Sequence, residues 1–185
     1  MAAFAILAGA AGQLPNTEAC IKNSYTRYEI LKCGTGELDG IQYPRLPLPG
    51  MLMLDRITWI SEEGGNYGHG EAKAEFEVNT DSWFFACHFK DDPVMPGSLA
   101  LDALCQLLGF YLGWKGYNGK GRALGIGAVK YKGEILPTSG TISYHLHIRK
   151  IVTGSIAVAI ADGEVSLQGH IVHTAKSLRV GIVPY

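Results

Sequence analysis

The fold is decided by residues 83–114, which read WFFACHFKDDPVMPGSLALDALCQLLGFYLGW. The second half of this stretch, Gly97 to Trp114, predicts a helix that is apolar around nearly its whole circumference and must be covered by protein or by lipid. Lipid is the weaker interpretation, because the segment only just reaches spanning length and carries Asp102 and Gln106 near its middle. We therefore expect one long central helix covered by a sheet.

Asp102 and His88 are the candidate chemical groups of this stretch. An ionised carboxylate alone in an apolar site is unfavourable by several kcal/mol, so such a group either pairs or stays protonated. A protonated acid can donate a proton, and His88 is the natural acceptor. Spacing alone leaves a second interpretation open, in which Asp102 bonds to Gln106 one turn on and His88 is an ordinary core histidine.

Composition frames the rest of the chain. With 185 residues, 47% apolar residues and a formal net charge of -1, it is typical of a single soluble globular domain. No basic run indicates nucleic acid binding. Cys20, Cys33, Cys87 and Cys105 lack the C-x-x-C spacing of metal and redox motifs. We expect thiols in a reducing, cytoplasmic compartment and no membrane anchor.

The N-terminal residues differ from those that follow. Residues 1–23 contain a small-residue apolar run without a basic region, and we expect a flexible extension that precedes a single domain over residues 24–185. The fold is expected to begin near Tyr25. Thr26 and Glu29 fit a capping box and Gly34 fits a stop, which predicts a short helix from Arg27 to Cys33.

Strand signals occupy most of the remaining chain. Residues 142–149 alternate most cleanly, and Gln168-Gly169 predicts a tight turn between the last two strands. Asp162-Gly163 marks a bulge or an earlier turn. The expected strands cover residues 51–60, 71–78, 122–132, 142–149, 155–167 and 170–183. The predicted class is α+β, an antiparallel sheet of about six strands curved around the helix, with an edge left for a second copy.

The other histidines and the glycine pattern give no strong indication of a metal site or a nucleotide site. His145 and His147 share one strand face, and His170 and His173 straddle another strand, but no third metal ligand is evident from the sequence. We therefore predict no metal site. No glycine-rich phosphate loop appears in a strand-loop-helix context, so no nucleotide cofactor is expected.

Several stretches together resemble the 3-hydroxydecanoyl-acyl-carrier-protein dehydratase/isomerase family. They are residues 87–114, residues 46–57 (LPLPGMLMLDRI), residues 121–138 (GRALGIGAVKYKGEILPT) and residues 161–165 (ADGEV), and the likeness extends over about Tyr25 to Val183. The resemblance implies a hot-dog fold and a homodimer. It also implies dehydration of (3R)-hydroxyacyl chains on acyl carrier protein to trans-2-enoyl chains, with isomerisation of the ten-carbon product to cis-3. We expect no cofactor.

The resemblance also assigns roles to single residues. It implies that His88 is the catalytic histidine and Asp102 the catalytic carboxylate, the two facing each other across the dimer interface. Aspartate rather than glutamate at position 102 favours the isomerising branch. Gly97 matches the glycine whose backbone N–H points at the thioester carbonyl, and Val94 matches the residue whose carbonyl accepts from the histidine ring. Gln106 is expected to orient Asp102.

The departures from the family pattern concern packing and docking. Ser98 and Cys105 replace the usual cysteine and tryptophan, which predicts altered packing or tunnel shape rather than lost activity. Residues 153–155 (TGS) stand where relatives often carry basic residues that meet the carrier protein. The remaining candidates for docking are Arg149, Lys150 and Arg179, and an ordinary solvated face is the alternative. Two rival functions stay open, an acyl thioesterase and a non-catalytic acyl-binding module.

Overall fold

A computed structural model describes residues 22–41 and 44–184 of the chain. These residues form two α-helices, one short 3-10 helix and seven strands. In chain order they are α1 (Arg27–Thr35), β1 (Arg56–Ser61), β2 (Glu71–Glu77), η1 (Trp83–Ala86), α2 (Gly97–Trp114), β3 (Lys120–Gly125), β4 (Ala128–Tyr131), β5 (Thr141–Thr153), β6 (Ala157–Leu167) and β7 (His170–Val183). The extension predicted for residues 1–23 lies outside the described residues up to position 21, and so does Cys20.

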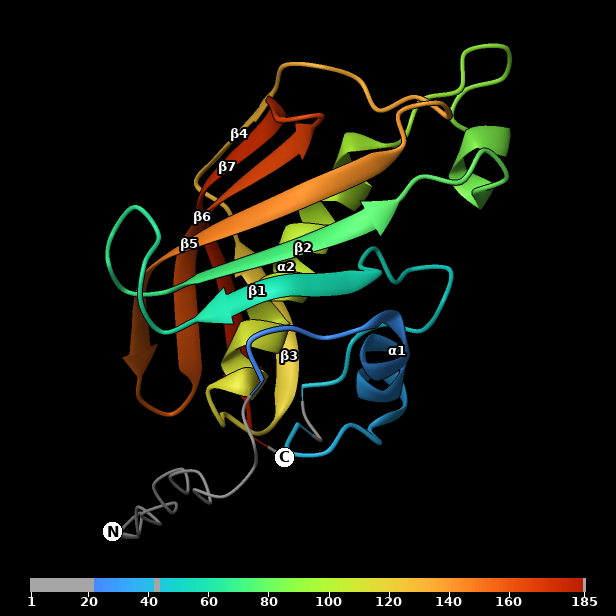
Figure 1. Cartoon of the computed structure of the whole chain (residues 1–185). Coiled ribbons are helices and arrows are strands. Elements are labelled where there is room, and N and C mark those ends of the chain that lie inside the picture. The colour runs from blue at the N-terminus through green and yellow to red at the C-terminus, as the bar shows by residue number, and fades with distance from the viewer. Residues whose placement is uncertain (1–21, 42–43, 185) are drawn as a thin grey trace, which may run out of the picture.

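The strands form one antiparallel sheet in the order β1-β2-β5-β6-β7-β3, with β4 also paired to β7 (Figure 1). The sheet therefore has seven strands rather than about six, because the single strand expected over residues 122–132 is divided in two. The chain leaves the ladder at Gly125, which has a φ of 154°, and β4 begins at Ala128. Both halves pair with successive parts of β7.

The helix α2 has the bounds expected from the sequence and packs against β7, β5, β6 and β2. Thirteen of its residues are buried, as its apolar circumference requires. The sheet meets it with the alternate side chains of its strands, such as Ala74, Tyr144 and Leu146, each at most 1% exposed. No helix of the described part of the chain is long and apolar enough to cross a membrane.

The helix α1 confirms the predicted start and corrects the predicted stop. Thr26 and Glu29 form the capping box. The helix continues past Gly34 and ends at Gly36, which has the left-handed φ of 83° that terminates helices. Gly34 instead serves close packing, since a Cβ there would lie 3.3 Å from the Pro47 carbonyl oxygen.

The turns mostly follow the sequence. β1 and β2 form the expected hairpin with a long loop, although β1 begins at Arg56 rather than Met51. Gln168 and Gly169 have positive φ values of 48° and 80° and connect β6 to β7 as predicted. Asp162-Gly163 lies inside β6, at a register shift between β6 and β7, so the bulge interpretation is correct.

The two edges of the sheet differ in how they are covered. The outer edge of β1 bonds to the segment before α1, because Tyr25 and Ile57 exchange both backbone hydrogen bonds at 2.9 Å. At the other edge, β3 and β4 pair only with β7 among the described strands. Leu124 and Tyr131 on this edge are 48% and 55% exposed. An open edge with apolar side chains is suited to pairing with another chain.

Candidate active site

His88 lies on the irregular segment between η1 and α2, and Val94 holds it twice. The Val94 N–H donates to the His88 carbonyl oxygen at 2.8 Å, and His88 Nδ1 lies 2.9 Å from the Val94 carbonyl oxygen. A carbonyl oxygen can only accept, so Nδ1 carries the ring hydrogen. In the neutral ring this leaves a lone pair on Nε2, which is the form that a general base requires.

Gly97 places the N-terminus of α2 beside His88. Because Gly97 is the first residue of the helix, its N–H has no partner within the helix and lies at the positive end of the helix dipole. A Cβ at position 97 would come within 2.5 Å of the Tyr131 ring, so only glycine fits without movement of that ring. The Met95 N–H donates to the Ile135 carbonyl oxygen at 2.8 Å and fixes this segment to the chain that follows β4.

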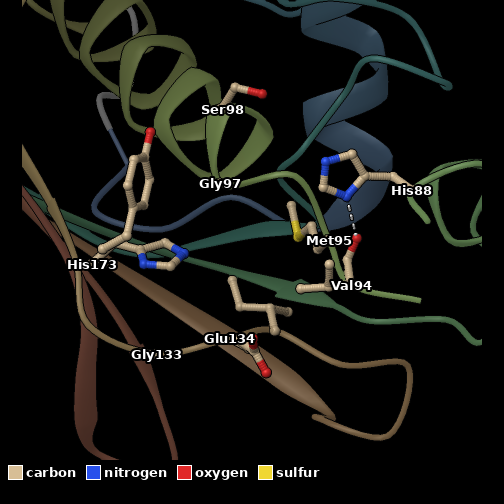
Figure 2. A pocket seen from close by; sticks show the side chains of 10 residues that line it. His88, Val94, Met95, Gly97, Ser98, Gly133, Glu134 and His173 are labelled. Carbon is tan, nitrogen blue, oxygen red and sulfur yellow. Dashed lines mark hydrogen bonds between the residues drawn. The ribbon is translucent and has the colours of Figure 1, made fainter. Parts of the chain in front are cut away.

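These elements line a cavity of about 270 Å³ that is open to solvent. Figure 2 shows His88 and His173 on opposite sides of it, with Gly97 between them at the start of α2. The lining residues are His88, Val94, Met95, Gly97, Ser98, Tyr131, Gly133, Glu134, Ile135 and His173. The cavity combines one imidazole with a free lone pair, the end of a helix dipole and a mostly apolar wall, an arrangement able to hold an acyl thioester and move a proton.

His173 lines the cavity, although the sequence suggested for it only a possible metal-binding role. It is 6% exposed, and its Nδ1 lies 2.6 Å from the Val172 carbonyl oxygen. Burial lowers the pKa of His173, although the Val172 carbonyl acts in the opposite direction. The sequence places His173 two residues before the apolar Ala175, and residues two apart share a strand face. This spacing was a signal that His173 points inward, as the buried Ala175 does.

Asp102 lies on α2, and Gln106 holds it in place. Gln106 Nε2 donates to Asp102 Oδ2 at 2.6 Å and to the Met51 carbonyl oxygen at 2.7 Å, while its Oε1 accepts from the Met53 N–H at 3.0 Å. These backbone partners fix which end of the amide faces Asp102. The contact between Gln106 and Asp102 is thus present, and it fits both the orienting role and the purely structural interpretation of Asp102. Burial and the nearby Asp102 raise the pKa of Cys105 to about 12, so it stays a thiol.

Asp102 is not among the residues that line the His88 cavity of this chain. Within one chain, the structure joins His88 to Val94 and Gly97, and Asp102 to Gln106, but it does not join the two groups. Either the two residues act separately, or a second copy completes the cavity.

The three candidate docking residues divide into two groups. Arg149 Nη1 donates to Ser177 Oγ at 3.0 Å and lies 3.7 Å from Asp162 Oδ1, so its charge is engaged within the sheet. Lys150 and Arg179 are both exposed and both pair with Ile160, one from each side. Because directly paired residues share a face, these two cations lie on the same surface two strands apart.

The described residues also contain free thiols and one cluster of potential metal ligands. Cys33, Cys87 and Cys105 are free thiols. One group of potential metal ligands is present in the described part of the chain, Glu71 with His145 and His147. It supplies the third ligand that the sequence did not reveal, and it lies outside the cavity around His88.

The chain is similar to several known proteins. The family model described as a FabA-like domain matches residues 46–176, more than half of the chain. The dehydratase heterocomplex ApeI:P from Xenorhabdus doucetiae superposes with a TM-score of 0.55 at 19% identity, over 74% of this chain and 86% of that one. AziG of S. sahachiroi superposes with a TM-score of 0.49 at 11% identity, over 70% of this chain and 90% of that one.

Proposed function

Because the chain belongs to the FabA-like domain family, we propose that it is a dehydratase that removes water from (3R)-hydroxyacyl thioesters to give trans-2-enoyl thioesters. The observation that carries the proposal is the His88 ring, oriented by the Val94 carbonyl and lining a cavity at the N-terminus of α2. This geometry provides a base and a place for a developing negative charge side by side.

The base acts first in this mechanism. The thioester carbonyl lies toward the Gly97 N–H, where the helix dipole stabilises negative charge on its oxygen. That stabilisation makes the C2 proton acidic, and His88 Nε2 takes it. Val94 keeps the other ring nitrogen protonated, so the resulting imidazolium retains its hydrogen bond.

Asp102 supplies the acid. It donates its proton to the C3 hydroxyl as the C3–O bond breaks, and the electron pair from C2–H forms the C2–C3 double bond. The products are a trans-2-enoyl thioester and one water molecule, with a proton left on His88 and lost from Asp102. Solvent exchange returns both residues to their starting states. Gln106 keeps the reactive carboxyl group in one orientation through its fixed amide.

We place Asp102 of a second copy in this role. In one chain Asp102 does not line the His88 cavity, whereas the edge formed by β3 and β4 has no further strand beside it among the described residues. Tyr131 belongs to that edge and also lines the cavity. A second copy docked there would approach the cavity directly, which supports a homodimer with composite sites.

The same pair of residues can perform isomerisation. If the acyl chain shifts so that His88 reaches C4, His88 takes a C4 proton while Asp102 gives a proton to C2, and the double bond moves from trans-2 to cis-3. We include this activity because position 102 holds aspartate. The proposed substrate carrier is acyl carrier protein, an acidic partner for the exposed cations Lys150 and Arg179.

One assay tests the proposal. Purified protein is incubated with 3-hydroxydecanoyl thioester, and the products are separated by chromatography into trans-2 and cis-3 isomers. We expect growth of the enoyl-thioester absorbance and both products. Release of free thiol without enoyl product would instead indicate a thioesterase. Unchanged substrate, bound but not converted, would indicate an acyl-binding module and overturn the proposal.

A further inference from the structure

We propose that Glu71, His145 and His147 form a binding site for a divalent transition metal ion of the Zn²⁺ type, on the face of the sheet opposite α2. Glu71 belongs to β2 and the two histidines to the neighbouring strand β5. In the register of these strands, Glu71 pairs directly with His147, and His145 is two residues away. Regular strand pairing therefore brings all three side chains to one face.

The donor atoms are close enough to share an ion. One ligand atom from each of the three residues lies within 4.8 Å of the other two. His145 Nε2 and Glu71 Oε2 are hydrogen-bonded at 2.7 Å, a contact that a shared ion would replace, and the two imidazole rings are 3.9 Å apart between centroids. Two imidazole nitrogens and a carboxylate oxygen form a ligand set that suits Zn²⁺ and similar borderline metals.

A second carboxyl group lies close to the three ligands. Glu164 of β6 pairs with His145 across the sheet, and its Oε2 lies 3.9 Å from His147 Nε2. Glu71 and Glu164 give this face two carboxyl groups beside the histidines, which favours a cation over an anion. Lys73 Nζ, 3.5 Å from Glu71 Oε1, is the nearest competing cation and its side chain is 43% exposed.

The site also contacts the loop between β1 and β2. The Asn66 N–H donates to His147 Nδ1 at 3.3 Å, a long hydrogen bond. A metal ion bound to His147 Nε2 requires the ring hydrogen on Nδ1, and that exchange removes the contact with Asn66. Metal binding is therefore expected to free the backbone N–H of Asn66 from its hydrogen bond. The ion itself would add a further link between β2 and β5.

Calorimetry of the full chain tests the site. Protein freed of metal with a chelator is titrated with ZnCl₂, in a Cys87→Ser background that removes the exposed thiol. We expect one ion per chain and a rise in Tm of roughly 5–10 °C at saturation. Separate Glu71→Gln and His145→Gln variants are expected to weaken binding by about tenfold or more. His170→Gln, an exposed histidine on β7, serves as the matched control and should bind normally.

Two readouts do not depend on the variants. Co²⁺ in place of Zn²⁺ is expected to give the visible absorption of a tetrahedral site, and hydrogen exchange at Asn66 is expected to accelerate when the ion binds. Failure of the wild-type chain to bind either ion overturns the proposal. Binding that survives a combined Glu71→Gln, His145→Gln and His147→Gln change also overturns it. Neither result bears on dehydration, which uses the opposite face of the sheet.

Discussion

The two faces of the sheet treat buried polar groups differently. On the face that packs on α2, the Tyr144 hydroxyl is buried with no hydrogen-bond partner among the described residues. On the opposite face, the buried Asp162 carboxylate accepts hydrogen bonds from three donors. Burial raises the pKa of Tyr144, so its hydroxyl stays neutral. Asp162 is 2% exposed and accepts from Tyr67 Oη at 2.6 Å, Lys176 Nζ at 2.8 Å and the Ser177 N–H at 2.9 Å.

This difference between the two faces suggests that one serves catalysis and the other serves stability. The groups proposed for dehydration lie on the helix face of the sheet. The His88 ring sits on an irregular segment and is held by one carbonyl oxygen, that of Val94. The groups of the opposite face are held by strand register and by several partners each. Changes at His88 are therefore expected to affect turnover, and changes at Asp162 are expected to affect folding.

The largest expected effect is the loss of turnover in His88→Ala or Asp102→Asn. Each substitution removes one proton transfer, which is typically worth about 10²–10⁴ in rate. The free energy of unfolding is expected to stay close to that of the wild type for His88→Ala, because this side chain has one hydrogen bond and is partly exposed. Initial rates with 3-hydroxydecanoyl thioester and denaturant titrations measure the two quantities.

Mixing the two inactive variants tests the composite site. After dissociation and random reassociation, half of the dimers contain one copy of each variant, and each mixed dimer has one intact site. The mixture should therefore regain about a quarter of wild-type activity. If the mixture stays as inactive as its components, His88 and Asp102 do not come from opposite copies.

The next effect concerns the opposite face. Asp162→Asn removes the charge that three donors surround, and we expect the free energy of unfolding to fall by about 1–3 kcal/mol. Turnover should remain within a factor of about two, because Asp162 lies outside the His88 cavity. Glu164→Gln, on the same strand face but half-exposed, is the control and should change stability by less. A large drop in turnover at unchanged stability would remove the distinction between the faces.

The contribution of Asp162 to stability should also appear as a dependence of the free energy of unfolding on pH in the acid range. Burial alone would raise the pKa of Asp162, but the hydrogen bonds from Lys176, Tyr67 and the Ser177 N–H outweigh it and lower that pKa below the ordinary value of 3.8. The stability that Asp162 contributes is therefore present above about pH 4 and is lost as the pH falls through its folded-state pKa. Denaturant titrations across this range should show a smaller acid loss in Asp162→Asn than in the wild type.

Two histidines add an earlier stage to the acid loss. Burial lowers the pKa of His173 and, together with the neighbouring His145, that of His147. The unfolded chain consequently binds protons first as the pH falls below about 6.5, and stability declines from that point downward. This upper stage should persist in Asp162→Asn. If it disappears there too, the two stages do not have separate origins.

Local sequence patterns predicted the regular elements, because those elements depend on neighbours in the chain. Alternation located β5, and the pair Gln168-Gly169 located the turn before β7. The division of β3 from β4 was missed because glycines within an apolar run do not show which one interrupts the ladder. The third metal ligand was missed for a different reason. Glu71 meets His147 only through the pairing of β2 with β5, which alternation within either strand does not specify.

The candidate site could be predicted from local sequence patterns less well than the fold. Spacing alone left His88 and Asp102 open to a purely structural interpretation, and only the family resemblance assigned them roles. The structure adds the contacts that orient each of them, His88 to Val94 and Asp102 to Gln106. A composite site across two copies leaves no signature in the spacing of one chain, since the two residues need not meet within it.

The smallest expected effect concerns carrier docking. Lys150 and Arg179 share an exposed surface, whereas Arg149 is held by Ser177 and belongs with the Asp162 network. Reversing both exposed charges, Lys150→Glu with Arg179→Glu, should raise KM for the carrier-bound substrate by roughly 2- to 10-fold, because exposed charge pairs contribute little each and salt screens them. The KM for a short thioester without the carrier should not change. The difference should shrink as salt is added, and Lys32→Glu on α1 should not produce it. Equal effects on both substrates would contradict carrier docking and would place these cations in folding or in the acyl site.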